Sequence, residues 1–171
     1  MDKLFEGELV KAFPEIFREY GGDIRNTCMG WGMSCEDGWF DLLYDMCYKV
    51  DSLIKNQSRE IKVVAKQVKE KFGGLRFYYS IEREQNLFEK IDSKISSFMF
   101  RHKLGRLYHK INDFRKKFYT TIIEQISDII SEAEMKSYKT CEVCGRYGER
   151  RGGGWIKTLC NECDEKRNKD A

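Results

Sequence analysis

Apolar residues between positions 38 and 55 recur in steps of three and four, which is the spacing of one helix face. Asp37 precedes them and is a favourable N-cap residue. Residues 38–55 are therefore expected to form an amphipathic helix. Its apolar stripe consists of Phe40, Leu43, Cys47, Val50 and Ile54.

A shorter helix is expected nearer the amino terminus. Residues 11–20 include the apolar pair Ile16 and Phe17, with Pro14 near the first turn and Gly21 at the end. Proline is harmless in a first turn because its missing N–H would have no partner there, and glycine commonly ends a helix.

Residues 60–82 show the two-residue alternation of a β-hairpin. A β-prone run begins at Val63, the letters FGG supply turn residues, and apolar and polar positions alternate afterwards. Two strands alone are marginally stable in water, so another element must cover their apolar side. The other side is typical either of a nucleic-acid face or of ordinary solvated strands. It carries Lys66, Lys69, Lys71, Arg76 and Tyr78.

From residue 84 to 137 an apolar stripe continues without proline, and Gly105 is the only glycine. The stripe predicts a long helix, or a helical hairpin broken near Gly105. Residues 98–118 hold seven lysines and arginines against one aspartate, a net charge of +6. A basic helix of this kind is typical of a surface that binds nucleic acid, an anionic membrane or an acidic partner. The alternative is that its charged residues form only the solvated face of a packed helix.

Two tryptophans and three glycines crowd into residues 30–39. Tryptophan rings flanked by glycines favour a pocket that stacks a flat ligand such as a nucleotide. The candidate pocket consists of Trp31, Trp39, Phe77 and Tyr79. The alternative interpretation is that the tryptophans fill the core beneath a tight loop.

Four of the seven cysteines stand in metal-ligand spacing. Cys141, Cys144, Cys160 and Cys163 form the pattern C-x2-C-x15-C-x2-C, which is typical of a structural zinc site with four thiolate ligands. Four thiolates close the coordination sphere, so one structural zinc ion is expected and a catalytic one is not. Iron occupies similar thiolate sites, so zinc is inferred from the spacing.

The segment around these cysteines carries cations and a tryptophan that suit phosphate contacts and base stacking. The candidate nucleic-acid contacts are Arg146, Arg150, Arg151, Trp155, Lys157 and Arg167. The alternative is that the finger only locks the chain end, because metal binding supplies folding free energy. Residues 139–171 hold eight lysines and arginines against six acids, and a four-thiolate zinc site contributes −2. Their net charge is then about zero, which weakens the nucleic-acid interpretation.

Composition favours one globular domain, or a small domain with an appended module. The 171 residues are 41% hydrophobic and 35% charged, and the formal net charge of +3 falls to about +1 with a four-thiolate zinc site. The chain has no run of about 18 apolar residues, and its first residues lack the apolar stretch of a secretory signal. We expect a cytoplasmic protein without a membrane span, in which any polyanion site is local.

Three motifs together resemble a group of small proteins encoded by bacteriophages and prophages. They are GWGMSCEDGWFDLL at residues 30–43, VKEKFGGLRFYY at residues 68–79, and the terminal segments CEVCG and GWIKTLC. The resemblance covers most of the chain except residues near 85–125. The cysteine frame is also similar to treble-clef fingers of the GATA type, but the segment between the pairs departs from that family, so no base-reading residue is carried over. The resemblance implies a phage context in a host cytoplasm and brings no activity with it.

Together these patterns predict an α+β protein in three segments. Residues 1–83 are a body of helices and a β-hairpin, residues 84–138 a long basic helical segment, and residues 139–171 a treble-clef or zinc-ribbon-like finger. The leading hypothesis is a non-enzymatic accessory protein that binds nucleic acid or a host protein. One alternative is a counter-defence protein that sequesters a nucleotide immune signal, or blocks a host effector, through the aromatic pocket. Another is a structural or assembly protein. No nucleophile motif or phosphate-cradling glycine loop points to an enzyme.

Overall fold

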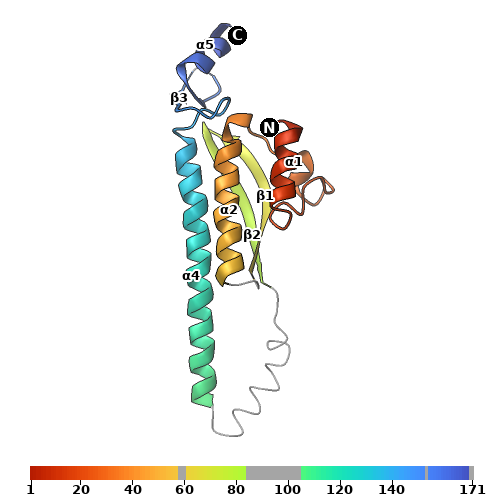
Figure 1. The fold of residues 1–171 in the computed structure, drawn as a ribbon, viewed down its shortest axis with the longest axis vertical. Helices are drawn as coiled ribbons and strands as arrows, with labels where there is room; N and C mark the ends of the chain where they lie inside the picture. Colours follow the sequence, from red (N-terminus) through yellow and green to blue (C-terminus); the bar gives the residue numbers. More distant parts are fainter. Residues whose placement is uncertain (58–60, 84–104, 153, 170–171) are drawn as a thin grey trace.

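The structure, a computed structural model, describes residues 1–57, 61–83, 105–152 and 154–169. Figure 1 shows amino-terminal helices beside a β-hairpin, one long helix, and a small second hairpin followed by a short helix. This arrangement confirms the predicted α+β class. The elements are α1 (Lys3–Ala12), η1 (Cys28–Trp31), η2 (Asp37–Trp39), α2 (Phe40–Gln57), β1 (Ile61–Lys71), β2 (Gly74–Arg83), α4 (Gly105–Ser137), β3 (Glu149–Arg151), β4 (Lys157–Leu159) and α5 (Asn161–Lys169).

The first helix lies earlier in the chain than the sequence predicts. α1 ends at Ala12, and residues 14–21 form consecutive turns, so the helix expected over residues 11–20 is wrong. Pro14 explains the end of α1, because proline has no N–H to donate and disfavours a helical conformation at the residue before it. The turns are then fixed by tertiary burial, as at Phe17, whose side chain is 1% exposed.

Helix α2 confirms the amphipathic helix that its apolar periodicity predicts. Asp37, however, does not cap it: the Asp37 carboxylate accepts a hydrogen bond of 2.6 Å from the backbone nitrogen of Asp2. The buried side of α2 includes Leu43, Met46 and Cys47. Burial raises the pKa of the Cys47 thiol, so this cysteine stays protonated and acts as a core residue.

Strands β1 and β2 form the predicted antiparallel hairpin. The register pairs Lys71 with Gly74, which leaves Phe72 and Gly73 as the two central turn residues. Their φ angles are +55° and +76°, as a type I′ turn requires. Glycine adopts such angles freely, whereas a bulky residue such as phenylalanine is strained by them.

Other parts of the chain cover both edges of this two-stranded sheet. On the outer edge of β1, the backbone of Ser34 exchanges two hydrogen bonds of 2.9 Å with the strand. On the outer edge of β2, the N–H groups of Leu75 and Phe77 donate to side-chain oxygens of Ser137 and Glu134 in α4, at 2.8 and 2.9 Å. These bonds satisfy backbone groups that a bare hairpin would leave exposed.

Helix α4 is continuous from Gly105, so the described part of the predicted stripe is one long helix. Its second half packs on α2 and β2 through side chains that include Ile122, Ile126 and Ile130. Its first half extends beyond the body in Figure 1, and Phe114 there is 72% exposed. The part of the stripe and of the basic segment before Gly105 lies outside the described residues.

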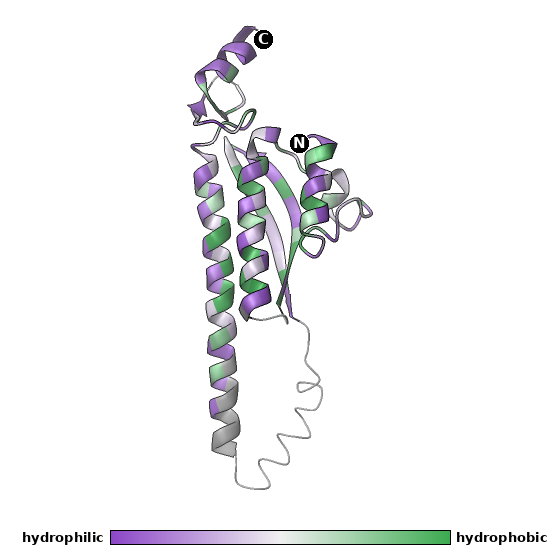
Figure 2. Cartoon of the chain, in the orientation of Figure 1, coloured by the Kyte–Doolittle hydropathy of each residue, from purple (hydrophilic) through white to green (hydrophobic). Residues whose placement is uncertain are grey.

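Hydrophobic residues recur along α2 and along the neighbouring part of α4, as Figure 2 shows. The carboxy-terminal unit at the upper end is largely hydrophilic by comparison. We call this unit the finger; it comprises residues 139–152 and 154–169. No helix within the described ranges combines the length and the apolarity that crossing a membrane requires.

Candidate metal centre and surface groove

The finger brings the four predicted cysteines together, with all four sulfur atoms within 4.8 Å of one another. Cys141 and Cys144 flank a turn that ends at Gly145, where φ is +75°. Cys160 follows β4, and Cys163 lies in the first turn of α5. A turn, a short hairpin and a helix thus supply the four sulfurs, and the cluster can hold one metal ion.

Burial and neighbouring groups shift the pKa values of these thiols in opposite directions. Burial and a hydrogen bond to Cys160 raise the pKa of Cys163. Burial also opposes ionisation of Cys144, but hydrogen bonds from Arg146 outweigh it and lower the pKa of that thiol to about 6. Four thiolates this close repel one another unless a cation lies between them. A divalent ion that prefers sulfur would displace the remaining protons and satisfy all four ligands.

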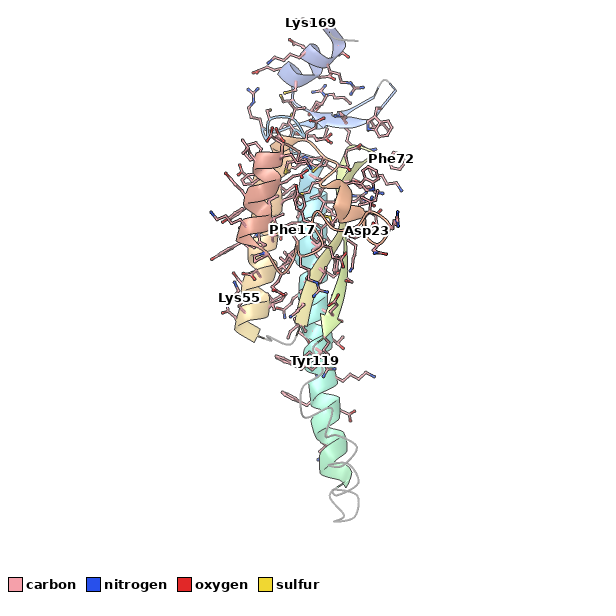
Figure 3. The ribbon with its side chains drawn as sticks, turned by 90° about the vertical axis from the view of Figure 1, so that its right-hand side faces the viewer. Phe17, Asp23, Lys55, Phe72, Tyr119 and Lys169 are labelled. Atoms are coloured by element: carbon pink, nitrogen blue, oxygen red, sulfur yellow. The ribbon has the colours of Figure 1, made fainter. Side chains whose placement is uncertain are left out.

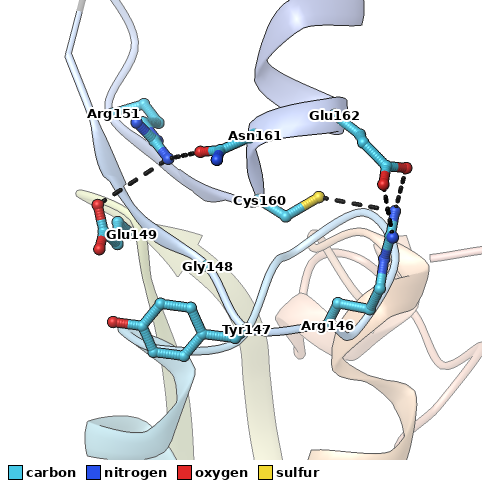
Figure 4. A pocket seen from close by; sticks show the side chains of 8 residues that line it. All are labelled: Arg146, Tyr147, Gly148, Glu149, Arg151, Cys160, Asn161 and Glu162. Carbon is cyan, nitrogen blue, oxygen red and sulfur yellow. Dashed lines mark hydrogen bonds and ion pairs between the residues drawn. The ribbon is translucent and has the colours of Figure 1, made fainter.

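The guanidinium of Arg146 is held beside this cluster (Figure 4). It donates hydrogen bonds of 2.9 and 2.5 Å to the two carboxylate oxygens of Glu162. It also lies 3.5 Å from the sulfur of Cys144 and 3.9 Å from that of Cys160. Such contacts orient metal ligands and offset thiolate charge. In this structure, the predicted nucleic-acid contact Arg146 lies against the cysteine cluster.

A polar cavity of about 480 Å³ adjoins the same cluster (Figure 4). Arg151 lines it, donates a hydrogen bond of 2.6 Å to Asn161 and lies 3.9 Å from a carboxylate oxygen of Glu149. Arg146 and Glu162 form the second charged pair on its wall. Because each guanidinium has a carboxylate partner, the cavity exerts little net attraction on a polyanion.

The finger rests on the turn that carries the Asp-Gly-Trp motif. The backbone nitrogen of Gly38 donates a hydrogen bond of 2.7 Å to the carbonyl oxygen of Glu142. A Cβ atom on Gly38 would lie 2.3 Å from the carbonyl oxygen of Cys141, so only glycine fits. Trp39 is fully buried, and its indole nitrogen donates a hydrogen bond of 2.9 Å to the carbonyl oxygen of Thr140. These contacts fasten the cysteine cluster to the helical body.

Two further candidate contacts also serve the fold. Lys157 forms an ion pair of 3.0 Å with Glu36, and this pair raises its pKa although burial opposes the charge. The guanidinium of Arg167 donates a hydrogen bond of 3.0 Å to the carbonyl oxygen of Trp155. Arg150 and Trp155 are the remaining two of the six predicted contacts, and both are exposed. Arg150 forms no ion pair within the described residues, and the ring of Trp155 is 69% exposed.

The predicted aromatic pocket is not assembled by its four residues. Trp39 and Phe77 belong to the hydrophobic core, and Tyr79 packs against it. Trp31 lies outside that core and is 70% exposed. The alternative interpretation was that both tryptophans fill the core beneath a tight loop. It therefore holds for Trp39 but not for Trp31.

A different groove lies between the tip of the β1–β2 hairpin and the finger. Its volume is about 450 Å³, and two exposed rings border it: Phe72 is 60% exposed and Trp155 is 69% exposed. Figure 3 places Phe72 at the hairpin tip, directly below the finger. The lining residues are Lys69, Glu70, Lys71, Phe72, Gly154, Trp155 and Ile156.

Cation–ring pairs begin at the lining residues of this groove and continue onto other residues of the hairpin and the finger. The Lys71 ammonium lies 5.5 Å from the centre of the Phe72 ring, and the Lys69 ammonium 5.2 Å from that of Tyr78. Arg76, paired with Lys69 across the hairpin, and Arg150 from β3 lie 5.6 and 5.5 Å from the ring of Tyr138. All eight residues are called the basic aromatic face below: Lys69, Lys71, Phe72, Arg76, Tyr78, Tyr138, Arg150 and Trp155.

Most cations of this face are not neutralised. Lys69, Lys71 and Arg150 form no ion pair with any residue that the structure describes. Arg76 lies 3.6 Å from Glu134 and donates a hydrogen bond of 2.5 Å to the hydroxyl of Tyr138. The face therefore differs from the polar cavity, where the arginines have carboxylate partners.

Sequence reasoning identified part of this face and missed the rest. The alternation of β1 and β2 indicated the basic side of the hairpin, but Phe72 counted only as a turn residue. Tyr138 follows α4 with no motif around it, and its position over Gly74 is a tertiary contact. The sequence did contain a signal for Phe72. It stands directly before Gly73, at the turn position where a type I′ turn favours asparagine, so a phenylalanine there is unusual.

Comparisons of this chain with protein-family models, curated proteins and solved structures find no match. The resemblance to bacteriophage and prophage proteins therefore stays an expectation. What the structure supports is the four-cysteine cluster, which is consistent with a zinc finger.

Proposed function

We propose that this protein is a non-enzymatic accessory factor that binds nucleic acid through its basic aromatic face. The observation that carries the proposal is the set of cations laid over aromatic rings where the hairpin meets the finger, with three of those cations free of ion pairs in the described chain. Cations attract the phosphate backbone, and exposed rings supply stacking surfaces for bases. The near-zero net charge of the finger is no obstacle, because three of the four cations of the face, Lys69, Lys71 and Arg76, belong to the hairpin.

In this proposal one zinc ion, held by the four cysteines, has an architectural role. Arg150 and Trp155 both belong to the segment between the cysteine pairs. A metal at the cluster would fix both ends of that segment and so hold its side chains against the hairpin. A closed set of four thiolates offers no open coordination position for a substrate, so the metal centre supports binding and not catalysis.

The phage-type context of the protein also belongs to this proposal. Its support is the resemblance carried by the tryptophan, hairpin and cysteine motifs. Accessory proteins of this kind act in the host cytoplasm, where a nucleic-acid-binding face meets both phage and host polynucleotides.

The test is fluorescence anisotropy with labelled single-stranded and duplex oligonucleotides. The double variant Lys71→Ala/Arg150→Ala removes two charges from the face, and its affinity should fall about tenfold or more. The matched control, Lys49→Ala/Lys55→Ala, removes the same charge from exposed positions of α2, where each lysine pairs with an aspartate one helical turn away. Equal affinity of the two double variants would remove the face from the binding site.

A second candidate function, docking to a host protein, is favoured by Trp31. This ring is 70% exposed although its flanking glycines are held tightly: a Cβ on Gly30 would lie 2.4 Å from the carbonyl oxygen of Gly22. An exposed tryptophan on a fixed loop is typical of an interface hot spot. If host-protein docking is the function, Trp31→Ala abolishes capture of the partner while nucleic-acid binding is unchanged.

A further inference from the structure

We propose that the bound nucleic acid is single-stranded and that one unpaired base inserts between the rings of Phe72 and Trp155. This inference rests on the proposed function and names the class of nucleic acid and the subsite. The groove between the two rings has a volume of about 450 Å³, within the range of sites that enclose small ligands.

One carboxylate joins the two segments that carry the rings. Glu70 accepts a hydrogen bond of 2.8 Å from the indole nitrogen of Trp155 through one oxygen. Its other oxygen accepts a hydrogen bond of 2.6 Å from the backbone nitrogen of Gly73, next to Phe72. The finger loop and the hairpin turn are thereby tied to the same side chain. The Trp155 ring and the backbone next to Phe72 are thus held together before any ligand arrives, which lowers the entropy cost of binding.

The backbone at Phe72 supports a role for its ring. At φ of +55°, a type I′ turn is best served by asparagine or glycine, and a phenylalanine there is strained. The ring is also 60% exposed, so core packing does not offset that strain. Strained residues of this kind cluster at ligand clamps, where the side chain is needed in one position.

The charges around the groove suit a single strand. Lys69 and Lys71 line the groove, and Lys71 stands beside Phe72, so phosphates next to an inserted base have cations nearby. Glu70 also lines the groove, and both of its carboxylate oxygens already accept hydrogen bonds from the protein. In a duplex the faces of the bases are covered by stacking, and only the phosphates would reach these residues. Helix α5 carries Glu162 and Asp164 in its first turn, which opposes the approach of a phosphate backbone to that end.

The experiment compares a single strand of about 12 nucleotides, carrying the fluorescent base 2-aminopurine, with a duplex of the same sequence. The protein is the full chain, loaded with zinc, at about 0.1 M salt. We expect the single strand to bind at least about tenfold more tightly than the duplex, with quenching of the base by stacking. Phe72→Asn should weaken single-strand binding about tenfold without lowering the thermal midpoint, because asparagine suits the turn. Trp155→Ala should weaken single-strand binding by a similar factor. Trp155→Phe keeps a ring but loses the hydrogen bond to Glu70, so its affinity should be intermediate.

Equal affinity for duplex and single strand, unchanged by Phe72→Asn, would overturn this inference. If Lys71→Ala/Arg150→Ala still weakened binding in that case, the proposed function would stand without it. Binding of a free mononucleotide as tightly as of the strand would also overturn the inference and direct attention to nucleotide sequestration. Absence of binding to both probes would overturn the inference and the proposed function together.

Discussion

Gly38 and Cys141 approach so closely that a Cβ atom on the glycine would lie 2.3 Å from the cysteine carbonyl oxygen. The first residue belongs to the turn before α2, and the second is a member of the cysteine cluster. Through this contact the Asp-Gly-Trp motif forms the surface on which the finger packs. The finger is thereby fastened beside the core residue Trp39, so the cysteine cluster and the helical body support each other.

Gly38→Ala should destabilise the protein. The added methyl group would also stand 2.5 Å from the backbone nitrogen of Gly145, so the finger would have to shift. Overpacking of this kind costs about 1–3 kcal/mol. Urea denaturation measures the loss, and metal analysis shows whether occupancy falls with it. Gly7→Ala is the matched control, because a Cβ at this position in α1 meets nothing within 4 Å and alanine favours a helix.

Metal analysis should find one zinc ion per chain. Cys144→Ser should lower that occupancy, because serine lacks the thiolate that a soft ligand set requires. Chelation of the metal should unfold the finger first and reduce nucleic-acid binding through Trp155 and Arg150. Cys28→Ser is the control, since Cys28 is exposed and lies outside the cluster. A protein that keeps its stability and binding after complete metal removal would contradict an architectural metal.

The buried carboxylate of Glu6 should make stability depend on pH. Burial alone would raise its pKa, but hydrogen bonds from Lys3, from Tyr20 at 2.5 Å and from the backbone of Met33 at 2.9 Å lower it overall. A carboxyl group whose pKa is lower in the folded state stabilises the protein at pH values above its unfolded pKa of 4.5. That contribution is lost as the pH falls through the folded pKa.

Glu6→Gln should therefore cost about 1–3 kcal/mol at neutral pH, and this cost should shrink below pH 4.5. Chemical denaturation at both pH values checks the sign. Glu8→Gln, an exposed position on the same helix, serves as the control. A cost that grows on acidification would refute the assignment.

Phe72→Asn should stabilise the isolated fold by about 1 kcal/mol, because it relieves a positive φ at a bulky residue. The midpoint of urea denaturation should rise accordingly. Phe72→Ala should not produce that gain, since alanine is also strained in this conformation. A stability loss with asparagine would show that the ring supports the fold, and its role in binding would need another explanation.

Local patterns in the sequence predicted the elements well, and long-range partners explain what they missed. The periodicity around Leu43 and the alternation around Phe77 specified α2 and the hairpin, and cysteine spacing specified the cluster. α1 was missed because the cap at Asp2 precedes a weak apolar pattern. Lys157 was assigned to nucleic acid because its partner Glu36 lies 121 positions away, and no local signal reports such a pair.

The salt dependence of nucleic-acid affinity tests the central proposal most directly. The logarithm of the association constant falls with the logarithm of salt by about 0.7 for each phosphate contact on a single strand. The slope for Lys71→Ala/Arg150→Ala should therefore be shallower than that of the unaltered protein by about 1.4, two contacts at 0.7 each. The slope for Lys49→Ala/Lys55→Ala should match the unaltered protein. Identical slopes and affinities for all three proteins would contradict binding through the basic aromatic face.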